Sequence, residues 1–238
     1  MDNPVDDASD AQVGSSTAAL ALRDQRKAIR ELGEALRTLV EQAAATEASP
    51  EVLRQAAAQI RAATAPLGER QRKREEMPSA DDLLGGIRMY NPVCGVGSAL
   101  APPLRVEMVD GTAVGTCTLG LAFEGPPTLA HGGVSALLLD QLLGHVSGAS
   151  GHPGMTVSLH TNYRAPVPLQ TPLRLSARVV EVNGRKVTAH GVIATAADPD
   201  TVLVEATGIF VALALHQARR LFGAALRPDE VDPAVAHD

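Results

Sequence analysis

The sequence is poor in aromatic residues, which make up 2% of its 238 residues, and it contains no tryptophan. Aromatic side chains are the platforms on which the bases of single-stranded nucleic acids stack. The formal net charge of −6 also opposes binding to a phosphate backbone. The composition therefore argues against nucleic acid as a partner.

Long hydrophobic runs are also missing. A membrane-spanning helix needs about 18 or more apolar residues in succession, and no such stretch without charges occurs. Residues 1–10 carry acids where a signal peptide would carry bases. We therefore expect no membrane span and a cytoplasmic location.

Cysteine is scarce, with Cys94 and Cys117 as its two instances and no C-x-x-C spacing. Two thiols are too few for a disulfide framework, although the sequence leaves a single bridge between them open. We expect both to be buried or half-buried. The histidines have no metal-ligand spacing with acids or thiols, so we expect no metal. We also expect no bound cofactor.

The hydrophobic content of 45% is enough for a sizeable core. The chain divides into five predicted parts by composition and periodicity. They are an acidic disordered tail over 1–15, a helical hairpin over 16–68, a charged linker over 69–89, a globular domain over 90–215 and a C-terminal tail over 216–238 with a short helix. The polar face of the hairpin mixes both charge signs, which favours a role in packing or oligomerisation over docking to a partner or to a membrane surface.

Within the globular domain, two strand-like runs precede one long apolar helix and four strand-like runs follow it. Asp110-Gly111 and Asn183-Gly184 are typical of hairpin turns. The predicted strands cover 104–109, 113–121, 155–163, 173–182, 186–196 and 201–213. A helix this apolar needs a sheet to cover it, so we predict an α+β fold in which an antiparallel sheet wraps around a central helix.

The central helix follows His131 and begins with two glycines, Gly132 and Gly133. Its only charge from residue 134 to 146 is Asp140, and no residue three or four positions away can pair with a carboxylate. An unpaired acid in an apolar helix is a candidate functional group. Open backbone N–H groups at the positive end of the helix are a candidate oxyanion hole.

The distance between the glycine amides and Asp140 bears on whether one chain can complete the site. Gly132 and Asp140 lie roughly 12 Å apart along one helix, from a rise of about 1.5 Å per residue, which is too far for both to touch one reacting carbon. Two helices related by a two-fold axis would set Gly132 of one against Asp140 of the other. We predict an obligate homodimer with two composite sites, and a tetramer is left open.

The chain from about residue 90 to 213 resembles the hotdog-fold thioesterases, in the PaaI-like branch and nearest the THEM4-like acyl-CoA thioesterases. The motifs that carry this resemblance are Glu124-Gly125-Pro126-Pro127, His131-Gly132-Gly133 with Asp140 nine residues after the histidine, Met155-Thr156, and Asn162-Tyr163-Arg164 with Pro166 and Pro168. The hairpin over 16–68 lies outside the resemblance.

The resemblance implies hydrolysis of an acyl-CoA, with coenzyme A as part of the substrate and no metal. It gives Gly132 the role of N–H donor to the thioester oxygen and Asp140 the role of general base or nucleophile. Thr156 would orient the water. His131 is a further catalytic candidate, although a histidine at a helix entry more often bonds to the backbone than to a substrate. The expected substrate-binding residues are Gly133, Asn162, Tyr163, Arg164, Arg185 and Lys186. The Leu-rich, aromatic-poor helix favours a medium to long aliphatic acyl chain.

Two other functions stay open at this stage. Asp140 and His145 have the five-residue spacing of hotdog enoyl-CoA hydratases, although the Gly-Asp-x-Asn-Pro loop of that class is absent. The chain could also bind acyl-CoA or a protein without catalysis, with the helical hairpin as a docking surface.

Overall fold

The structure of the chain is a computed structural model that describes residues 7–82, 85–102, 104–214, 217 and 220. Two helices come first, α1 (Asp7–Ala45) and α2 (Pro50–Gly68). The remaining elements are β1 (Arg105–Val109), β2 (Thr112–Thr118), the short 3-10 helix η1 (Leu121–Phe123), α3 (Gly132–Ala149), β3 (Met155–Tyr163), β4 (Pro172–Asn183), β5 (Lys186–Thr195) and β6 (Val204–Val211). No helix in the described ranges is long and apolar enough to cross a membrane.

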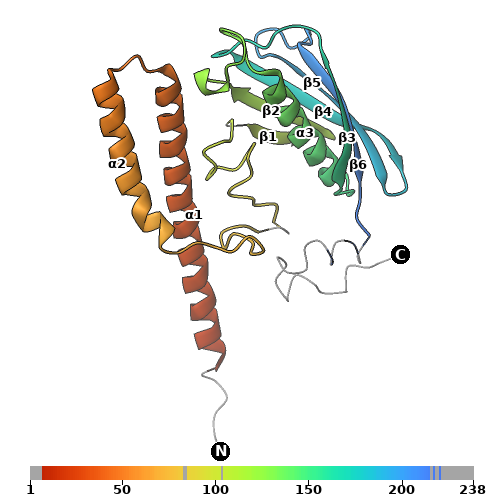
Figure 1. The fold of residues 1–238 in the computed structure, drawn as a ribbon. Helices are drawn as coiled ribbons and strands as arrows, with labels where there is room; N and C mark the ends of the chain where they lie inside the picture. Colours follow the sequence, from red (N-terminus) through yellow and green to blue (C-terminus); the bar gives the residue numbers. More distant parts are fainter. Residues whose placement is uncertain (1–6, 83–84, 103, 215–216, 218–219, 221–238) are drawn as a thin grey trace, which may run out of the picture.

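The strands form one six-stranded antiparallel sheet in the order β1-β2-β4-β5-β6-β3, and α3 packs against one face of it (Figure 1). β3 follows α3 in the chain and pairs only with β6, so it forms an edge of the sheet. This is the α+β arrangement predicted from the sequence, with all six strands at the expected places.

The core lies between α3 and the sheet. Leu138, Leu139, Leu142 and Leu143 of α3 are fully buried, because they occupy the helix face that meets the strands. The strands contribute alternate residues, as a sheet with one covered face requires. The largest of these buried strand side chains are Leu173, Leu175, Val187, Ile193, Val204 and Phe210.

The hairpin turns follow from local chemistry. Asp110 and Gly111 both have positive φ, 47° and 75°, which confirms the turn predicted between β1 and β2. The second turn differs by one residue from the prediction. Asn183 is the last residue of β4 and pairs with Lys186, so Gly184, with φ of 56°, and Arg185 form the turn.

The N-terminal helix is longer than predicted. α1 begins at Asp7, so residues 7–15 are helical and the predicted disordered tail is wrong for them; residues 1–6 lie outside the described residues. At the other end of the chain, only Gln217 and Arg220 of the predicted tail over 216–238 are described, so its short helix lies largely outside the described residues.

The predicted linker over 69–89 is packed against the rest of the protein at its C-terminal end. Ala80 and Asp81 are buried, at 1% and 4% exposure. The Asp81 carboxylate accepts the backbone N–H of Met89 at 2.8 Å and pairs with Arg88 at 3.1 Å. Arg26 of α1 donates to the carbonyl oxygen of Ala80 at 2.9 Å. The first part of the segment, residues 69–76, is exposed as predicted.

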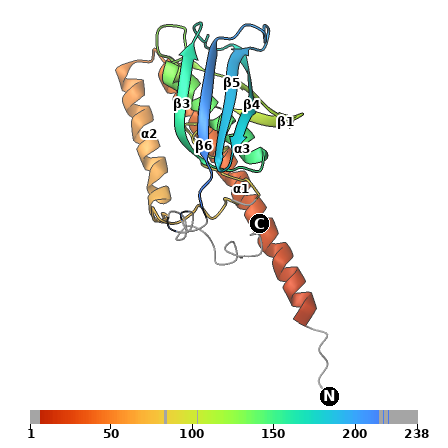
Figure 2. The same cartoon turned by 90° about the vertical axis from the view of Figure 1, so that its right-hand side faces the viewer.

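Polar contacts join α1 to the domain that carries the sheet. The Arg37 guanidinium donates to the carbonyl oxygens of Val96 and Ser98, each at 2.9 Å. The Glu41 carboxylate accepts the N–H groups of Leu121 and Ala122 in η1, at 2.8 and 3.1 Å. In Figure 1, α1 lies between α2 and the sheet, and Figure 2 shows the outer face of the sheet turned away from both helices. α2 has no buried residue.

Candidate active site

The centre of the candidate site is a hydrogen bond between α3 and β3. The hydroxyl of Thr156 donates to Oδ1 of Asp140 at 2.9 Å. Asp140 is half-buried, and its other oxygen has no hydrogen-bond partner among the described residues. One carboxylate oxygen is therefore fixed in position while the other is open to a water molecule or substrate.

A local irregularity of β3 follows Thr156 directly. The pairing of β3 with β6 shifts register between Thr156 and Ser158, so Val157 has no partner across the ladder. Such bulges turn a side chain away from the regular alternation and are frequent beside active sites. The exposed Val157 also lies on an edge strand of the sheet, where no other strand in the described residues pairs with its free side.

The second part of the site is the beginning of α3. His131 is the N-cap, and its Nδ1 accepts the N–H of Gly133 at 3.0 Å. The Gly133 N–H is thus occupied in this structure, and the expectation that both glycine amides are open is wrong for it. The N–H of Gly132 has no acceptor within the described chain. It is the amide that is free to stabilise a developing negative charge.

Tyr163 at the end of β3 closes over Gly132. Its hydroxyl donates to the Gly132 carbonyl oxygen at 3.0 Å, which orients the peptide at the start of α3. A cavity of about 310 Å³ lies beside this contact, and Gly132, Ser135, Tyr163 and Arg164 are among the residues that line it. Gly132, the residue of the predicted oxyanion donor, therefore lines a cavity together with two predicted substrate-binding residues, Tyr163 and Arg164.

The predicted substrate contacts of Asn162 and Arg164 have an internal partner. Both side chains donate to Glu205 of β6, at 3.3 Å from Asn162 and 2.6 Å from Arg164. The hydrogen bond from Arg164 holds the pKa of Glu205 below its ordinary value; partial burial opposes this effect and Asn162 supports it. Arg164 is thus committed to a carboxylate of its own chain, and its contact with coenzyme A stays a prediction.

Arg185 and Lys186 lie at the other end of the sheet. Lys186 pairs with Val211 of β6, and Val211 pairs with Met155 of β3, the residue before Thr156. With strands about 4.8 Å apart, Lys186 stands two strands, or roughly 10 Å, from the Asp140 end of β3. The Arg185 guanidinium donates to the Ala212 carbonyl oxygen at 3.3 Å.

The site residues thus form two groups at opposite ends of β3. Asp140 and Thr156 stand at its start, and Gly132 and Tyr163 stand at its end. Thr156 and Tyr163 are seven positions apart along the strand, which is roughly 23 Å at about 3.3 Å per residue. A single chain does not bring the two groups together.

The Asp140 and His145 pair of the hydratase alternative does not form. Five residues along a helix turn the side chain by about 140°, so the two side chains leave α3 in different directions. His145 is exposed, and no contact joins it to Asp140 in the described structure. This geometry disfavours the hydratase.

The two cysteines are free thiols, half-buried at Cys94 and buried at Cys117, as expected. Burial raises the pKa of Cys117 to about 12, and it raises that of Cys94 to a lesser extent. Across the described residues, no three His, Cys, Asp or Glu side chains gather in a way that would hold a metal ion.

Sequence reasoning missed three supporting residues. Glu205 holds Asn162 and Arg164, Asn91 donates from its side chain to Gln141 of α3 at 3.0 Å, and Ser135 is buried beside the cavity at Gly132. Ser135 could have been singled out from the sequence, because a hydroxyl group in the first turn of an otherwise apolar helix is unusual. The partners of Glu205 and Asn91 are more than 40 residues away in the sequence, and no local pattern marks them.

An antiparallel sheet around one apolar helix is the hotdog arrangement, and comparison with known proteins agrees with it. A model of the thioesterase superfamily matches residues 128–202. The chain is similar to a thioesterase superfamily protein of known crystal structure, with 36% sequence identity and a TM-score of 0.68 over 77% of this chain and 94% of that one. The chain belongs to the thioesterase superfamily, which confirms the family predicted from the sequence.

The relatives of this chain include acyl-coenzyme A thioesterases. Acyl-coenzyme A thioesterase THEM4 of Bos taurus is 33% identical over 94 residues, which cover 40% of this chain and 38% of that protein. THEM4 of Xenopus laevis is 34% identical over 96 residues, covering 40% and 42%. THEM5 of Homo sapiens is 26% identical over 98 residues, covering 41% and 39%. The match spans about two fifths of the length of these relatives.

Proposed function

We propose that this chain hydrolyses acyl-CoA thioesters, with Asp140 as the catalytic carboxylate and the Gly132 N–H as the oxyanion donor. The observation that carries the proposal is the Thr156–Asp140 hydrogen bond, which holds one carboxylate oxygen and leaves the other open. The unpartnered amide of Gly132 beside a cavity of about 310 Å³ supports it, as do the acyl-coenzyme A thioesterases among the relatives.

The chemistry needs few groups because a thiolate leaves readily. As a general base, Asp140 takes a proton from water while the water oxygen bonds to the thioester carbon. The carbonyl oxygen becomes an oxyanion that accepts the Gly132 N–H. Collapse of this intermediate breaks the C–S bond, and the thiolate takes up the proton. As a nucleophile, Asp140 would attack the carbon itself, and water would hydrolyse the resulting anhydride.

Either route requires two subunits. Gly132 and Asp140 of one chain are roughly 12 Å apart along α3. The exposed edge of β3 offers a place for a second copy, because unpaired strand edges with apolar side chains favour association. Met155 and Val157 on this strand are 48% and 61% exposed. In the proposed homodimer, Asp140 and Thr156 of one subunit face Gly132 and Tyr163 of the other.

The proposed substrate carries a medium to long aliphatic acyl group. α3 presents Leu137, which is 38% exposed, one turn before Asp140, and aromatic side chains that would suit an aryl group are scarce. Arg185 and Lys186 at the Asp140 end of the sheet are further candidates for contact with coenzyme A.

The test is a panel of acyl-CoA substrates of increasing chain length, assayed by release of the free thiol. Asp140→Asn should lower kcat by about 100-fold or more, the usual contribution of a general base. Glu181→Gln, an exposed carboxylate of β4, is the matched control and should keep full activity. Undiminished turnover in Asp140→Asn would disprove the assigned role. Tight acyl-CoA binding without turnover in the unaltered protein would favour a binding module.

A further inference from the structure

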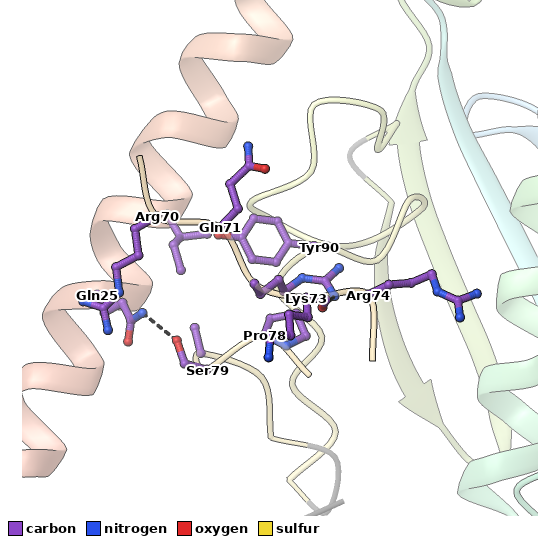
Figure 3. Close-up of a pocket in the computed structure, with 11 residues that line it drawn as sticks. Gln25, Arg70, Gln71, Lys73, Arg74, Pro78, Ser79 and Tyr90 are labelled. Atoms are coloured by element: carbon purple, nitrogen blue, oxygen red, sulfur yellow. Dashed lines mark hydrogen bonds between the residues drawn. The ribbon is translucent and has the colours of Figure 1, made fainter. Parts of the chain in front are cut away.

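A cavity of about 780 Å³ lies outside the candidate active site, between α1 and residues 70–90. Figure 3 shows the ring of Tyr90 at the centre of the residues that line it, with Arg70 beside α1. Its volume is in the range of small-molecule sites. The lining residues come from α1 (Gln25, Ile29), from the charged segment (Arg70, Gln71, Arg72, Lys73, Arg74) and from the chain beyond it (Pro78, Ser79, Ala80, Tyr90).

The charge of this cavity is opposite to that of the whole protein. Four cationic side chains line it and no carboxylate does, although the chain as a whole has a net charge of −6. Arg74 pairs with Glu75 at 3.2 Å and extends away from the others in Figure 3. Within the described structure, Arg70 and Lys73 have no ion-pair partner for their side chains.

Two hydrogen bonds between Arg72, Lys73 and Glu76 shape the charged segment. Arg72 donates to the carbonyl oxygen of Glu76 at 2.8 Å, and the Glu76 carboxylate accepts the N–H of Lys73 at 3.0 Å. These bonds form a turn that places cations on the cavity wall and keeps the Glu76 carboxylate out of the lining. Guanidinium and ammonium groups arranged in this way suit phosphate oxygens.

The remaining walls suit a base and sugar. Tyr90, one of the two tyrosines of the chain, offers an aromatic face for stacking. Ile29 and Pro78 add apolar surface, and Gln25 and Ser79 form a hydrogen-bonded polar pair at 2.9 Å. A cationic rim with one aromatic ring matches a phosphorylated nucleoside better than an acidic peptide or a bare phosphate ion.

A hydrogen bond also links one wall of this cavity to α3. Tyr90 is followed by Asn91, whose amide donates to Gln141 of α3 at 3.0 Å, and Gln141 is the neighbour of Asp140 in the chain. The loop that forms one wall of the cavity is thus fastened to α3 next to the catalytic carboxylate. An acyl-CoA carries its thioester and its adenosine bisphosphate at opposite ends of a long flexible arm.

We propose that this cavity binds the adenosine 3′,5′-bisphosphate end of the acyl-CoA substrate, with Arg70 and Lys73 holding phosphates and Tyr90 stacking on the adenine. The helical hairpin and the segment after it would then form a substrate-recognition extension of the thioesterase domain. This inference rests on the proposed function for the identity of the ligand.

The test measures binding and turnover separately. Adenosine 3′,5′-bisphosphate is titrated by calorimetry into the full chain, into the double variant Arg70→Ala/Lys73→Ala, and into Arg61→Ala. Arg61 is an exposed cation of α2 that does not line the cavity, so it is the matched control. Both altered cations are exposed, and an unchanged thermal midpoint will show that the double variant is folded.

We expect the dissociation constant of the bisphosphate to rise by about tenfold or more in the double variant and to stay unchanged in Arg61→Ala. The KM for acyl-CoA should rise by a similar factor, and this rise should vanish with acyl-pantetheine, which lacks the nucleotide. Tyr90→Ala should weaken bisphosphate binding without affecting inorganic phosphate.

Unchanged bisphosphate binding in the folded double variant would overturn the proposal, and so would equal affinity for inorganic phosphate and the bisphosphate. If the protein binds the bisphosphate through Arg70 and Lys73 but hydrolyses no thioester, the cavity assignment holds and the proposed hydrolysis fails. If hydrolysis is normal while the double variant changes neither binding nor KM, the cavity assignment alone fails.

Discussion

The Thr156 hydroxyl and the Asp140 carboxylate are joined by a hydrogen bond of 2.9 Å between the edge strand and the central helix. Thr156 is the second residue of β3, directly before the bulge, and Asp140 stands in the middle of α3. Because the hydroxyl proton is committed to Oδ1, the lone pairs of the Thr156 oxygen remain available to accept from a water molecule. The pair can therefore hold a water near the open oxygen of Asp140.

Replacement of Thr156 tests this arrangement. Thr156→Val removes the hydroxyl and keeps the shape of the side chain, so Asp140 loses its fixed orientation. A hydrogen bond to a charged group contributes about 1.5–3 kcal/mol, which corresponds to a fall in kcat of roughly 10- to 100-fold. Thr156→Ser keeps the hydroxyl and should retain most of the activity. The measurement is kcat and KM for an acyl-CoA; equal rates for the two variants would contradict the role of the hydroxyl.

Much of the fold followed from the sequence because periodicity and turn chemistry are local. The alternation of β4 and β5 and the Asp110-Gly111 turn each depend on a few neighbouring residues. The Asp140–Thr156 pairing was expected only through the family resemblance. The bond from the Gly133 amide to His131 agrees with the interpretation of His131 as a helix-entry residue that bonds to the backbone, although the sequence did not identify which amide it would occupy.

Contacts between segments that are distant in the sequence could not be predicted from local sequence patterns. The predicted linker packs on α1 because Gln25 and Arg26 donate to Ser79 and to the carbonyl oxygen of Ala80, 54 residues away, and nothing in the charge pattern specifies these partners. The attachment of α1 to η1 through Glu41 joins residues about 80 positions apart. In each case the sequence alone indicates a solvent-exposed polar or charged side chain, because its hydrogen-bond partner comes from a segment that is distant in the sequence.

The Glu41 contact predicts a measurable coupling between α1 and the domain that carries the sheet. Glu41→Ala removes the acceptor for the N–H groups of Leu121 and Ala122, and should lower the free energy of unfolding by about 1–3 kcal/mol. Amide hydrogen exchange should speed up at those two residues. Glu34→Ala, on the same helix, is the control and should change neither quantity. Unaltered exchange in Glu41→Ala would show that other contacts hold α1.

The different burial of Cys94 and Cys117 predicts that their thiols react at different rates. A raised pKa lowers the thiolate fraction at a given pH, and the thiolate is the reactive form. With a pKa of about 12 and little exposure, Cys117 should be nearly inert toward Ellman's reagent at pH 8, while half-buried Cys94 should react slowly. Cys94→Ser should remove the slow phase, and guanidinium should release both thiols of the unaltered protein. Rapid reaction of Cys117 in the folded protein would contradict its burial.

The edge of β3 gives the sharpest test of the composite site. Val157 and Val180 are 61% and 60% exposed, and each lies at a register shift, but Val157 is on the edge strand and Val180 is on β4 inside the sheet. Val157→Asp should place a charge in the proposed interface, dissociate the proposed dimer in sedimentation and abolish turnover, because Gly132 and Asp140 of different subunits would separate. Val180→Asp introduces the same charge at equal exposure and should leave both assembly and activity intact. A Val157→Asp monomer with full activity would show that one chain completes the site alone.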